Sequence, residues 1–186
     1  GGVGRLIVSP SGRTRETAYI VNSYVAADVD YDEVLMERDC GEWSGLTMAE
    51  IEQHFPRAWQ GRLDDPFRHR PPAGENLEDM LERAKEFLES LYGLDTPTVG
   101  LVTHGVMSRV ILTYFLQLGP VEAVRVKHPN EIFYRLEFEP AKIKPSHFVE
   151  GAGPLPGLLR ETADGTIAHP EGFNGSSRDE IENREE

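Results

Sequence analysis

The sequence predicts an α/β fold in which helices flank a mostly parallel sheet. Two stretches carry this prediction, because each joins a short apolar strand to a helix that follows at once. Arg5–Val8 is followed by Ser9-Pro10, a pair typical of a helix N-cap and first turn. Val99–Val102 is a second apolar strand, and from Val106 onward apolar residues recur at helical spacing. Strands that alternate with helices favour a parallel sheet between layers of helix.

The elements between these two units follow from local patterns. Residues 31–35 predict a second strand, and Thr47 with Glu50 has the spacing of a capping box for a short helix that ends near Phe55-Pro56. Residues 57–73 show little periodicity, so we expect an irregular flap over the substrate. The first helix is expected to bury Thr17, Ala18, Val21, Tyr24 and Val25.

Asn76 is placed to cap the clearest helix of the chain. Its apolar stripe comprises Leu77, Met80, Leu81, Ala84, Phe87, Leu88 and Leu91. Farther on, residues 132–139 alternate as a half-buried strand near a sheet edge. Beyond Pro140 this pattern ends, so we expect one domain over residues 1–140 and an irregular, partly disordered acidic tail over residues 141–186.

Composition narrows the classes of function. The formal net charge is −13 with no basic stripe, which argues against a nucleic-acid partner. No apolar run approaches the roughly 18 residues that a membrane span needs, so no membrane partner is expected. The single cysteine, Cys40, excludes an internal disulfide and predicts a cytoplasmic location. The oligomeric state stays open, a homo-oligomer included.

Two candidate turns meet at the carboxyl edge of the predicted sheet. Arg13 lies in the first turn of the first helix, and Thr103-His104-Gly105 joins the later strand to its helix. Ligands bind at this edge of open α/β sheets. A helix N-terminus favours an anion, and arginine offers a planar fork of donors to phosphate oxygens. The pattern predicts a site for a small phosphorylated substrate.

Four ordered motifs then resemble the histidine phosphatase superfamily, also called the phosphoglycerate mutase-like family. The resemblance covers roughly residues 5–139 and implies a three-layer sandwich. The motifs are Val8-Ser9-Pro10-Ser11-Gly12-Arg13-Thr14-Arg15-Glu16-Thr17-Ala18, Leu35-Met36-Glu37 through Gly41-Glu42-Trp43-Ser44-Gly45, Pro71-Pro72-Ala73-Gly74-Glu75-Asn76, and Val102-Thr103-His104-Gly105.

The resemblance implies a role for each matching residue. Arg13 would clamp the phosphate together with His104 and Gly105. His104 would stabilise the transferring phosphoryl group as the second active-site histidine. Glu37 would give a proton to the leaving oxygen and later take one from water. The scheme requires no metal and no cofactor.

Two further residues are candidates for the substrate loop. Glu75 lies beside the pocket in the family and is expected to support the following helix. Arg68 belongs to the flap, where it is expected either as a solvated charge, the favoured interpretation, or as a contact for a second anionic group of the substrate.

The sequence departs from the family at one motif. The family's first strand ends in Arg-His-Gly, whose histidine is the nucleophile, and this sequence contains no Arg-His-Gly. The expected fold therefore lacks the first strand, which would leave two unpaired edges within the sheet. An N-terminal piece outside the given chain, a degenerate relative, or a strand from another chain would each explain the difference; we favour the first.

The expected activity is hydrolysis of phosphomonoesters through a phosphohistidine. A mutase-type phosphotransferase is less favoured, because the interval from Glu37 to His104 is short beside the insertions of mutases. The alternative from another class is a non-catalytic phosphate-binding or scaffold protein.

Overall fold

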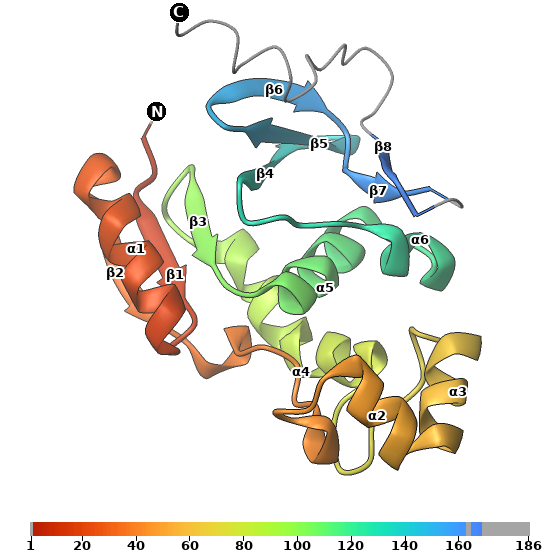
Figure 1. Ribbon diagram of the computed structural model, residues 1–186. Helices are drawn as coiled ribbons and strands as arrows, with labels where there is room; N and C mark the ends of the chain where they lie inside the picture. Colours follow the sequence, from red (N-terminus) through yellow and green to blue (C-terminus); the bar gives the residue numbers. More distant parts are fainter. Residues whose placement is uncertain (1, 163–164, 169–186) are drawn as a thin grey trace, which may run out of the picture. The chain divides into compact units, whose positions relative to one another are not determined.

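The computed structural model describes residues 2–162 and 165–168. It confirms an α/β fold with a parallel sheet (Figure 1). The chain divides into two compact units, one up to Val124 and one from Arg125 onward. The helices and strands of the first unit are β1 (Arg5–Val8), α1 (Gly12–Val25), β2 (Asp28–Tyr31), α2 (Met48–His54), α3 (Pro56–Asp64), α4 (Leu77–Ser90), β3 (Val99–Val102) and α5 (Gly105–Leu116), with short 3₁₀ turns at Glu33–Leu35, Gly41–Trp43 and Leu91–Gly93.

The parallel sheet has the order β2-β1-β3, with β1 in the middle. Arg5 aligns with Asp28 on one side and with Val99 on the other. The expectation of two unpaired edges within the sheet is wrong for the described residues, because β1 pairs with a neighbour on each side. The register also brings the ends of β1 and β3 level, at Val8 and Val102.

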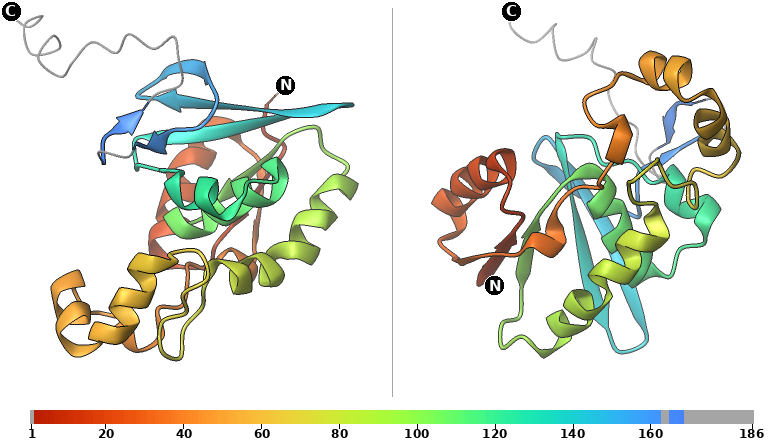
Figure 2. Two further views of the ribbon diagram at one scale, coloured as in Figure 1. Left: turned by 90° about the vertical axis from the view of Figure 1, so that its right-hand side faces the viewer. Right: turned by 90° about the horizontal axis from the view of Figure 1, so that it is seen from below.

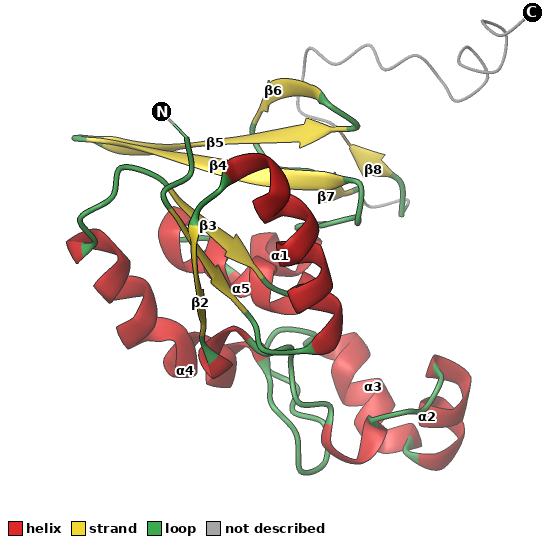
Figure 3. Cartoon of the chain, turned by 90° about the vertical axis from the view of Figure 1, so that its left-hand side faces the viewer, coloured by secondary structure: helices red, strands yellow, loops and turns green. Residues whose placement is uncertain are grey.

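Helix α1 covers one face of this sheet, and α4 and α5 lie on the other (Figure 3). Leu6 and Val8 form a buried cluster with Ala18 of α1. The predicted buried face of α1 is wrong in part: Thr14 and Ala18 are buried, whereas Thr17 and Tyr24 are exposed. A sheet of three short strands can bury only a narrow strip of the α1 surface. The side chains of α1 on either side of that strip remain exposed to solvent.

Two boundaries differ from the sequence prediction. Ser11, not Ser9, is the N-cap of α1, which leaves the Ser9 side chain free for another contact. The second strand ends at Tyr31, where residues 31–35 were expected to be extended. The Asp32 side chain accepts a hydrogen bond from the Val34 amide and caps a 3₁₀ turn there.

The segment expected to be an irregular flap begins as a helix. The capping box of Thr47 and Glu50 is confirmed at the start of α2. Helix α3 then follows at Pro56, because proline suits the first turn of a helix. Figure 2 shows α2 and α3 side by side, away from the parallel sheet of the first unit. The expected irregular backbone is thus restricted to the part after Asp64.

Helix α4 agrees with its prediction. Asn76 and Asp79 form a reciprocal capping box, in which each side chain accepts from the other residue's backbone amide. Of the predicted stripe, Leu77, Met80, Ala84 and Leu88 are buried. The Asn76 side chain also donates to the Arg68 carbonyl, so it ties the preceding loop to the helix.

The prediction of an irregular tail over residues 141–186 is wrong for its described part, because the second unit contains strands there. Its elements are the strand β4 (Ile132–Glu139), which was predicted, and β5 (Lys142–Val149), β6 (Ala152–Pro156), β7 (Arg160–Glu161) and β8 (Ile167–Ala168). Strands β4, β5 and β6 form an antiparallel sheet with β4 at its edge, and β7 pairs with β8. Helix α6 (Pro120–Arg125) spans the boundary between the units. The frequent prolines and glycines of this region made its sequence look irregular, so β5 to β8 were not predicted. The predicted disorder of the last dozen residues lies outside the described residues, and the division at residue 140 stays a prediction.

No described helix is long and apolar enough to cross a membrane.

Replacing Asn76 with alanine should lower the free energy of unfolding by about 1–2 kcal/mol, because one side chain makes both the cap and the loop contact. Asn76→Asp keeps the acceptor and should lose less. Urea titrations followed by circular dichroism measure both. Equal losses for the two variants would contradict a capping role.

Candidate functional site

The candidate site starts from a direct contact between Arg13 and His104 at the carboxyl edge of the sheet. His104 is the N-cap of α5 and is only 6% exposed. The Arg13 Nε and Nη2 atoms lie 3.0 Å and 2.7 Å from His104 Nδ1. The strand register explains the contact, because β1 and β3 end level and their following turns meet.

These bonds fix the protonation of the imidazole. Arginine only donates, so Nδ1 must accept and the proton of the neutral ring belongs on Nε2. Burial lowers the pKa of His104 below its ordinary value, the charge of Arg13 acts in the same direction, and Glu37 opposes them. His104 is therefore a neutral imidazole near pH 7 that carries a donor on Nε2.

Ser9 completes this hydrogen-bond chain. Its Oγ lies 2.8 Å from His104 Nε2 and donates to the Met36 sulfur at 3.3 Å. The serine is fully buried, and its carbonyl accepts from the Thr14 hydroxyl. Sequence analysis treated Ser9 as a helix cap and missed this contact, which depends on the pairing of β1 with β3.

Glu37 lies at the N-terminus of the helix that His104 caps. Its two carboxylate oxygens accept from the Val106 and Met107 amides, both at 3.2 Å. These amides lack partners within the helix, and the helix dipole favours a negative charge there. The structure therefore brings three of the predicted residues together: Arg13, His104 and Glu37.

A bidentate ion pair holds the loop that carries Glu37. Arg83 of α4 donates from Nε and Nη2 to the two oxygens of Glu75, at 2.9 Å and 3.0 Å. Glu75 in turn accepts from the Asp39 amide at 3.0 Å, two residues beyond Glu37. Both side chains are mostly buried, at 27% and 22% exposed.

Arg83 also fixes the other side of the same loop. Its Nη1 atom donates to the Val34 carbonyl at 2.7 Å, and the Thr103 hydroxyl donates to the Leu35 carbonyl at 2.7 Å. The backbone is thus anchored both before and after Glu37. Arg83 was not a predicted site residue. The sequence feature that could have indicated Arg83 is a charged side chain between Met80 and Ala84, two residues of the apolar stripe of α4.

Two glycines allow this loop to approach the segment before α4. Gly41 has a φ of +51°, and a Cβ there would lie 2.1 Å from the Pro72 carbonyl oxygen. A Cβ on Gly74 would lie 2.7 Å from the Asp39 carbonyl oxygen. The close backbone contact lets Glu75 reach the Asp39 amide.

The remaining candidate residues lie as follows. Arg68 is an ion-pair partner of Glu78 at 2.9 Å and of Asp65 at 3.6 Å. Glu75 belongs to the loop anchor described above. Gly105 is the first residue of α5, next to His104. The roles of these three residues in binding stay predictions.

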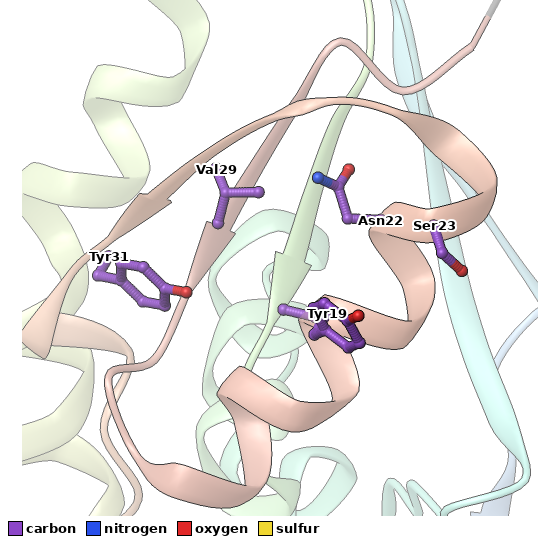
Figure 4. A pocket seen from close by; sticks show the side chains of 6 residues that line it. Tyr19, Asn22, Ser23, Val29 and Tyr31 are labelled. Carbon is purple, nitrogen blue, oxygen red and sulfur yellow. The ribbon is translucent and has the colours of Figure 1, made fainter.

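The described residues contain no group of three His, Cys, Asp or Glu side chains that could hold a metal ion. A surface pocket of about 340 Å³ lies between α1 and β2, lined by Ala18, Tyr19, Asn22, Ser23, Val29 and Tyr31 (Figure 4). None of the candidate residues lines it. The pocket is therefore separate from the site at His104.

The fold and this cluster define an α/β protein with a site formed by Arg13, His104 and Glu37 at the carboxyl edge of a parallel sheet. A family model confirms the class: the histidine phosphatase superfamily (branch 1) matches residues 2–150, and the chain belongs to this superfamily.

Particular relatives are similar over much of the chain. The bifunctional protein Rv2228c of Mycobacterium tuberculosis is 28% identical over 163 residues, which cover 87% of this chain and 42% of that protein. The 6-phosphofructo-2-kinase/fructose-2,6-bisphosphatase 4 of Rattus norvegicus is 30% identical over 125 residues, or 66% of this chain and 26% of that protein. The chain thus spans less than half the length of these curated relatives.

Solved structures share the fold. The alpha-ribazole phosphatase from Shigella flexneri superposes with a TM-score of 0.68 at 15% sequence identity. The matched region covers 77% of this chain and 71% of the phosphatase chain. The mycobacterial glucosyl-3-phosphoglycerate phosphatase bound to inorganic phosphate has a TM-score of 0.67 at 23% sequence identity. The matched region covers 82% of this chain and 78% of that phosphatase chain. At these identities the likeness supports the fold alone.

The loop anchor can be tested by a double-mutant cycle. Arg83→Gln and Glu75→Gln should each lower the free energy of unfolding by about 1–3 kcal/mol, because each leaves a mostly buried partner unpaired. The double variant should lose less than the sum. Arg5→Gln, which breaks the exposed pair with Asp30, should cost less than about 1 kcal/mol. Additive losses from the two single variants would show that the pair does not act as a unit.

Proposed function

We propose that this protein hydrolyses small phosphomonoesters through a phosphohistidine intermediate. The observation that carries the proposal is the direct contact of Arg13 with His104 at the sheet edge, with Glu37 on the same helix N-terminus. Phosphoryl transfer needs positioning and neutralisation of developing charge more than covalent chemistry from the protein. A fixed cation and a fixed neutral donor meet that need.

Each residue has a separate role in the proposed reaction. Arg13 clamps the phosphate, since its guanidinium has more donors than the two that face His104. His104 turns its Nε2 proton, which Ser9 accepts in the described structure, to a phosphoryl oxygen and so stabilises the charge that develops during transfer. In its protonated form Glu37 gives a proton to the leaving alkoxide as the phosphorus–oxygen bond breaks, and the carboxylate that this leaves accepts from the Val106 and Met107 amides. Water then attacks the phosphohistidine, and Glu37 takes its proton, which yields inorganic phosphate.

The nucleophile is not assigned to a described residue. The sequence has no Arg-His-Gly motif. Ser9 does not fit the role, because His104 Nδ1 accepts from Arg13 and Nε2 then carries a proton. A serine nucleophile needs a neighbouring base with a free lone pair. The proposal therefore places the described residues in the phosphate-handling part of the site.

Phosphatase activity is proposed over mutase activity because the segment between Glu37 and His104 is short. The names of the relatives agree with this choice, since they include a fructose-2,6-bisphosphatase and two phosphatases. The proposal includes a cytoplasmic location, on the basis of one cysteine in the sequence.

A second candidate is a non-catalytic phosphate-binding protein. The contact of Arg13 with His104 favours it, because these two residues can hold an anion without transferring it. The two candidates differ in turnover, not in phosphate binding.

Hydrolysis of p-nitrophenyl phosphate by the chain tests the proposal. Glu37→Gln should lower kcat by about 10²–10⁴-fold with a smaller change in KM, because the carboxyl acts on the leaving oxygen. His104→Ala should remove the activity, whereas Arg70→Gln, at an exposed pair with Asp79, should not change it.

Calorimetric titration with inorganic phosphate separates the candidates. Folded protein that binds phosphate through Arg13 but hydrolyses no phosphomonoester would overturn the catalytic proposal in favour of the binding protein. Equal losses of kcat and of phosphate binding in Glu37→Gln would show that the role given to Glu37 is wrong.

A further inference from the structure

Strand β2 forms an outer edge of the parallel sheet. In the order β2-β1-β3 it pairs with β1 on one side, and no described strand pairs with it on the other. The Asp28 amide donates to the Gly4 carbonyl just before β1, at 3.2 Å, so the backbone of Asp28 faces β1. Because backbone groups alternate along a strand, the N–H and C=O groups of Val29 and Tyr31 face outward. Outward backbone groups at a sheet edge can pair with a further strand.

The pocket between α1 and β2 lies beside these outward groups. Figure 4 shows Val29 and Tyr31 together with Tyr19 of α1 around the pocket. Tyr19 is 81% exposed and Tyr31 is 50% exposed, so both rings present surface to a ligand. The Asn22 amide and the Ser23 hydroxyl, which also line the pocket, donate to backbone carbonyls of their own segment. The pocket therefore suits an apolar side chain. We call Asp28–Tyr31 with this pocket the β2 edge.

The other face of β2 is acidic. Side chains alternate between the two faces of a strand, so Asp28 and Asp30 lie on the face away from the pocket. Both side chains are exposed. Asp30 accepts from Arg5 Nε at 2.6 Å, in an ion pair that is itself exposed. Two carboxylates against one arginine leave this face with a negative charge.

The two faces of the β2 edge select different side chains. On the pocket face the Arg15 guanidinium lies over the Tyr31 ring, 4.5 Å from the ring centre. A second cation there would be repelled by Arg15, whereas an apolar side chain can pack against the exposed rings. On the other face an apolar side chain would cover carboxylates, which is unfavourable, whereas a lysine or arginine is attracted to them.

A second copy of this chain fits the β2 edge poorly. In a two-fold symmetric pairing of two β2 strands, the outward-facing Val29 and Tyr31 must lie opposite outward-facing residues of the other copy. Even-numbered residues then lie opposite even-numbered ones, so Asp30 meets residue 28, 30 or 32 of the other copy, each of which is an aspartate. Like charges directly opposite each other are destabilising. The net charge of −13 also repels a second copy.

We propose that the β2 edge binds an extended basic segment of a partner protein, which adds a strand to the parallel sheet. The backbone of the segment pairs with Val29 and Tyr31, and its alternate side chains reach opposite faces. Its apolar side chains enter the pocket beside Tyr19, and its lysines or arginines lie against Asp28 and Asp30. The partner is therefore recognised by basic and apolar residues that alternate over about five positions.

The acetylated and amidated peptide Lys-Val-Lys-Val-Lys, with a fluorescent label, is the probe. Its binding to the full chain is followed by fluorescence anisotropy at low salt. The peptide Lys-Lys-Lys-Val-Val has the same composition without the alternation, and Glu-Val-Glu-Val-Glu has the alternation with the opposite charge. The alternating basic peptide should bind about tenfold tighter than either control, because only it suits both faces.

Methylation of the peptide backbone tests the added strand separately. The amides of alternate residues in an added strand face β2, and the others face solvent. One version of the alternating basic peptide is methylated at its second and fourth amides, and another at its third and fifth. One version should lose binding and the other should keep it. Loss in both versions, or in neither, would overturn the added strand.

Substitutions in the β2 edge test the two faces. Asp28→Asn should weaken binding of the alternating basic peptide about threefold, the size of one exposed ion pair. Tyr19→Ala should weaken it about tenfold, because an aromatic contact of the pocket is lost. Tyr24→Ala and Glu52→Gln are the matched controls and should bind like the unaltered chain. Tyr24 is an exposed tyrosine of α1 that does not line the pocket, and Glu52 is an exposed carboxylate of α2.

Three outcomes would overturn the proposal. Equal binding of the three unmethylated peptides would show that the β2 edge does not read the alternation. Unchanged binding in both Asp28→Asn and Tyr19→Ala would show that the acidic protein attracts the peptide elsewhere. A dimer of the unaltered chain in sedimentation that Tyr19→Ala dissociates would assign the β2 edge to a second copy. Circular dichroism melts establish that each variant is folded.

Discussion

The contact between Arg13 and His104 is the interaction on which the described site depends. It exists because β1 and β3 pair in register and end level, so that the first turn of α1 meets the N-cap of α5. Arg13 donates to Nδ1 of the imidazole, so the proton of the neutral ring is on Nε2. From there the ring donates a hydrogen bond to the Ser9 hydroxyl oxygen. Arg13 thus sets the tautomer and orientation of the imidazole, and burial together with the Arg13 charge lowers its pKa. Both a catalytic role and a binding role require a defined protonation state.

The second constraint is the anchored loop around Glu37. Arg83 and Glu75 tie α4 to this loop on both sides, and the close approach at Gly41 and Gly74 makes that possible. Glu37 is then held at the amides of α5, one turn from His104. A site assembled from three separate chain segments depends on such support, because an error of about 1 Å in a reacting group can cost two orders of magnitude in rate.

The sequence predicted the parts of the fold that depend on local patterns. The capping box at Thr47, the helix cap at Asn76 and the strand Val99–Val102 are confirmed, because neighbouring residues decide them. Arg13, Glu37 and His104 could be found from ordered motifs. Partners set by tertiary pairing could not: Arg83 for Glu75, the burial of α1, and the paired strands beyond residue 141 depend on contacts between distant segments.

The protonation of His104 tests the account most directly. Long-range correlation of the imidazole nitrogens with the ring protons, assigned with a His104→Asn variant, distinguishes the two neutral tautomers and the imidazolium. At pH 7 the Arg13 contact predicts a neutral ring with the proton on Nε2, because burial and the guanidinium lower the pKa of His104. A proton on Nδ1, or a charged ring, would contradict the geometry from which the phosphate-handling role is argued.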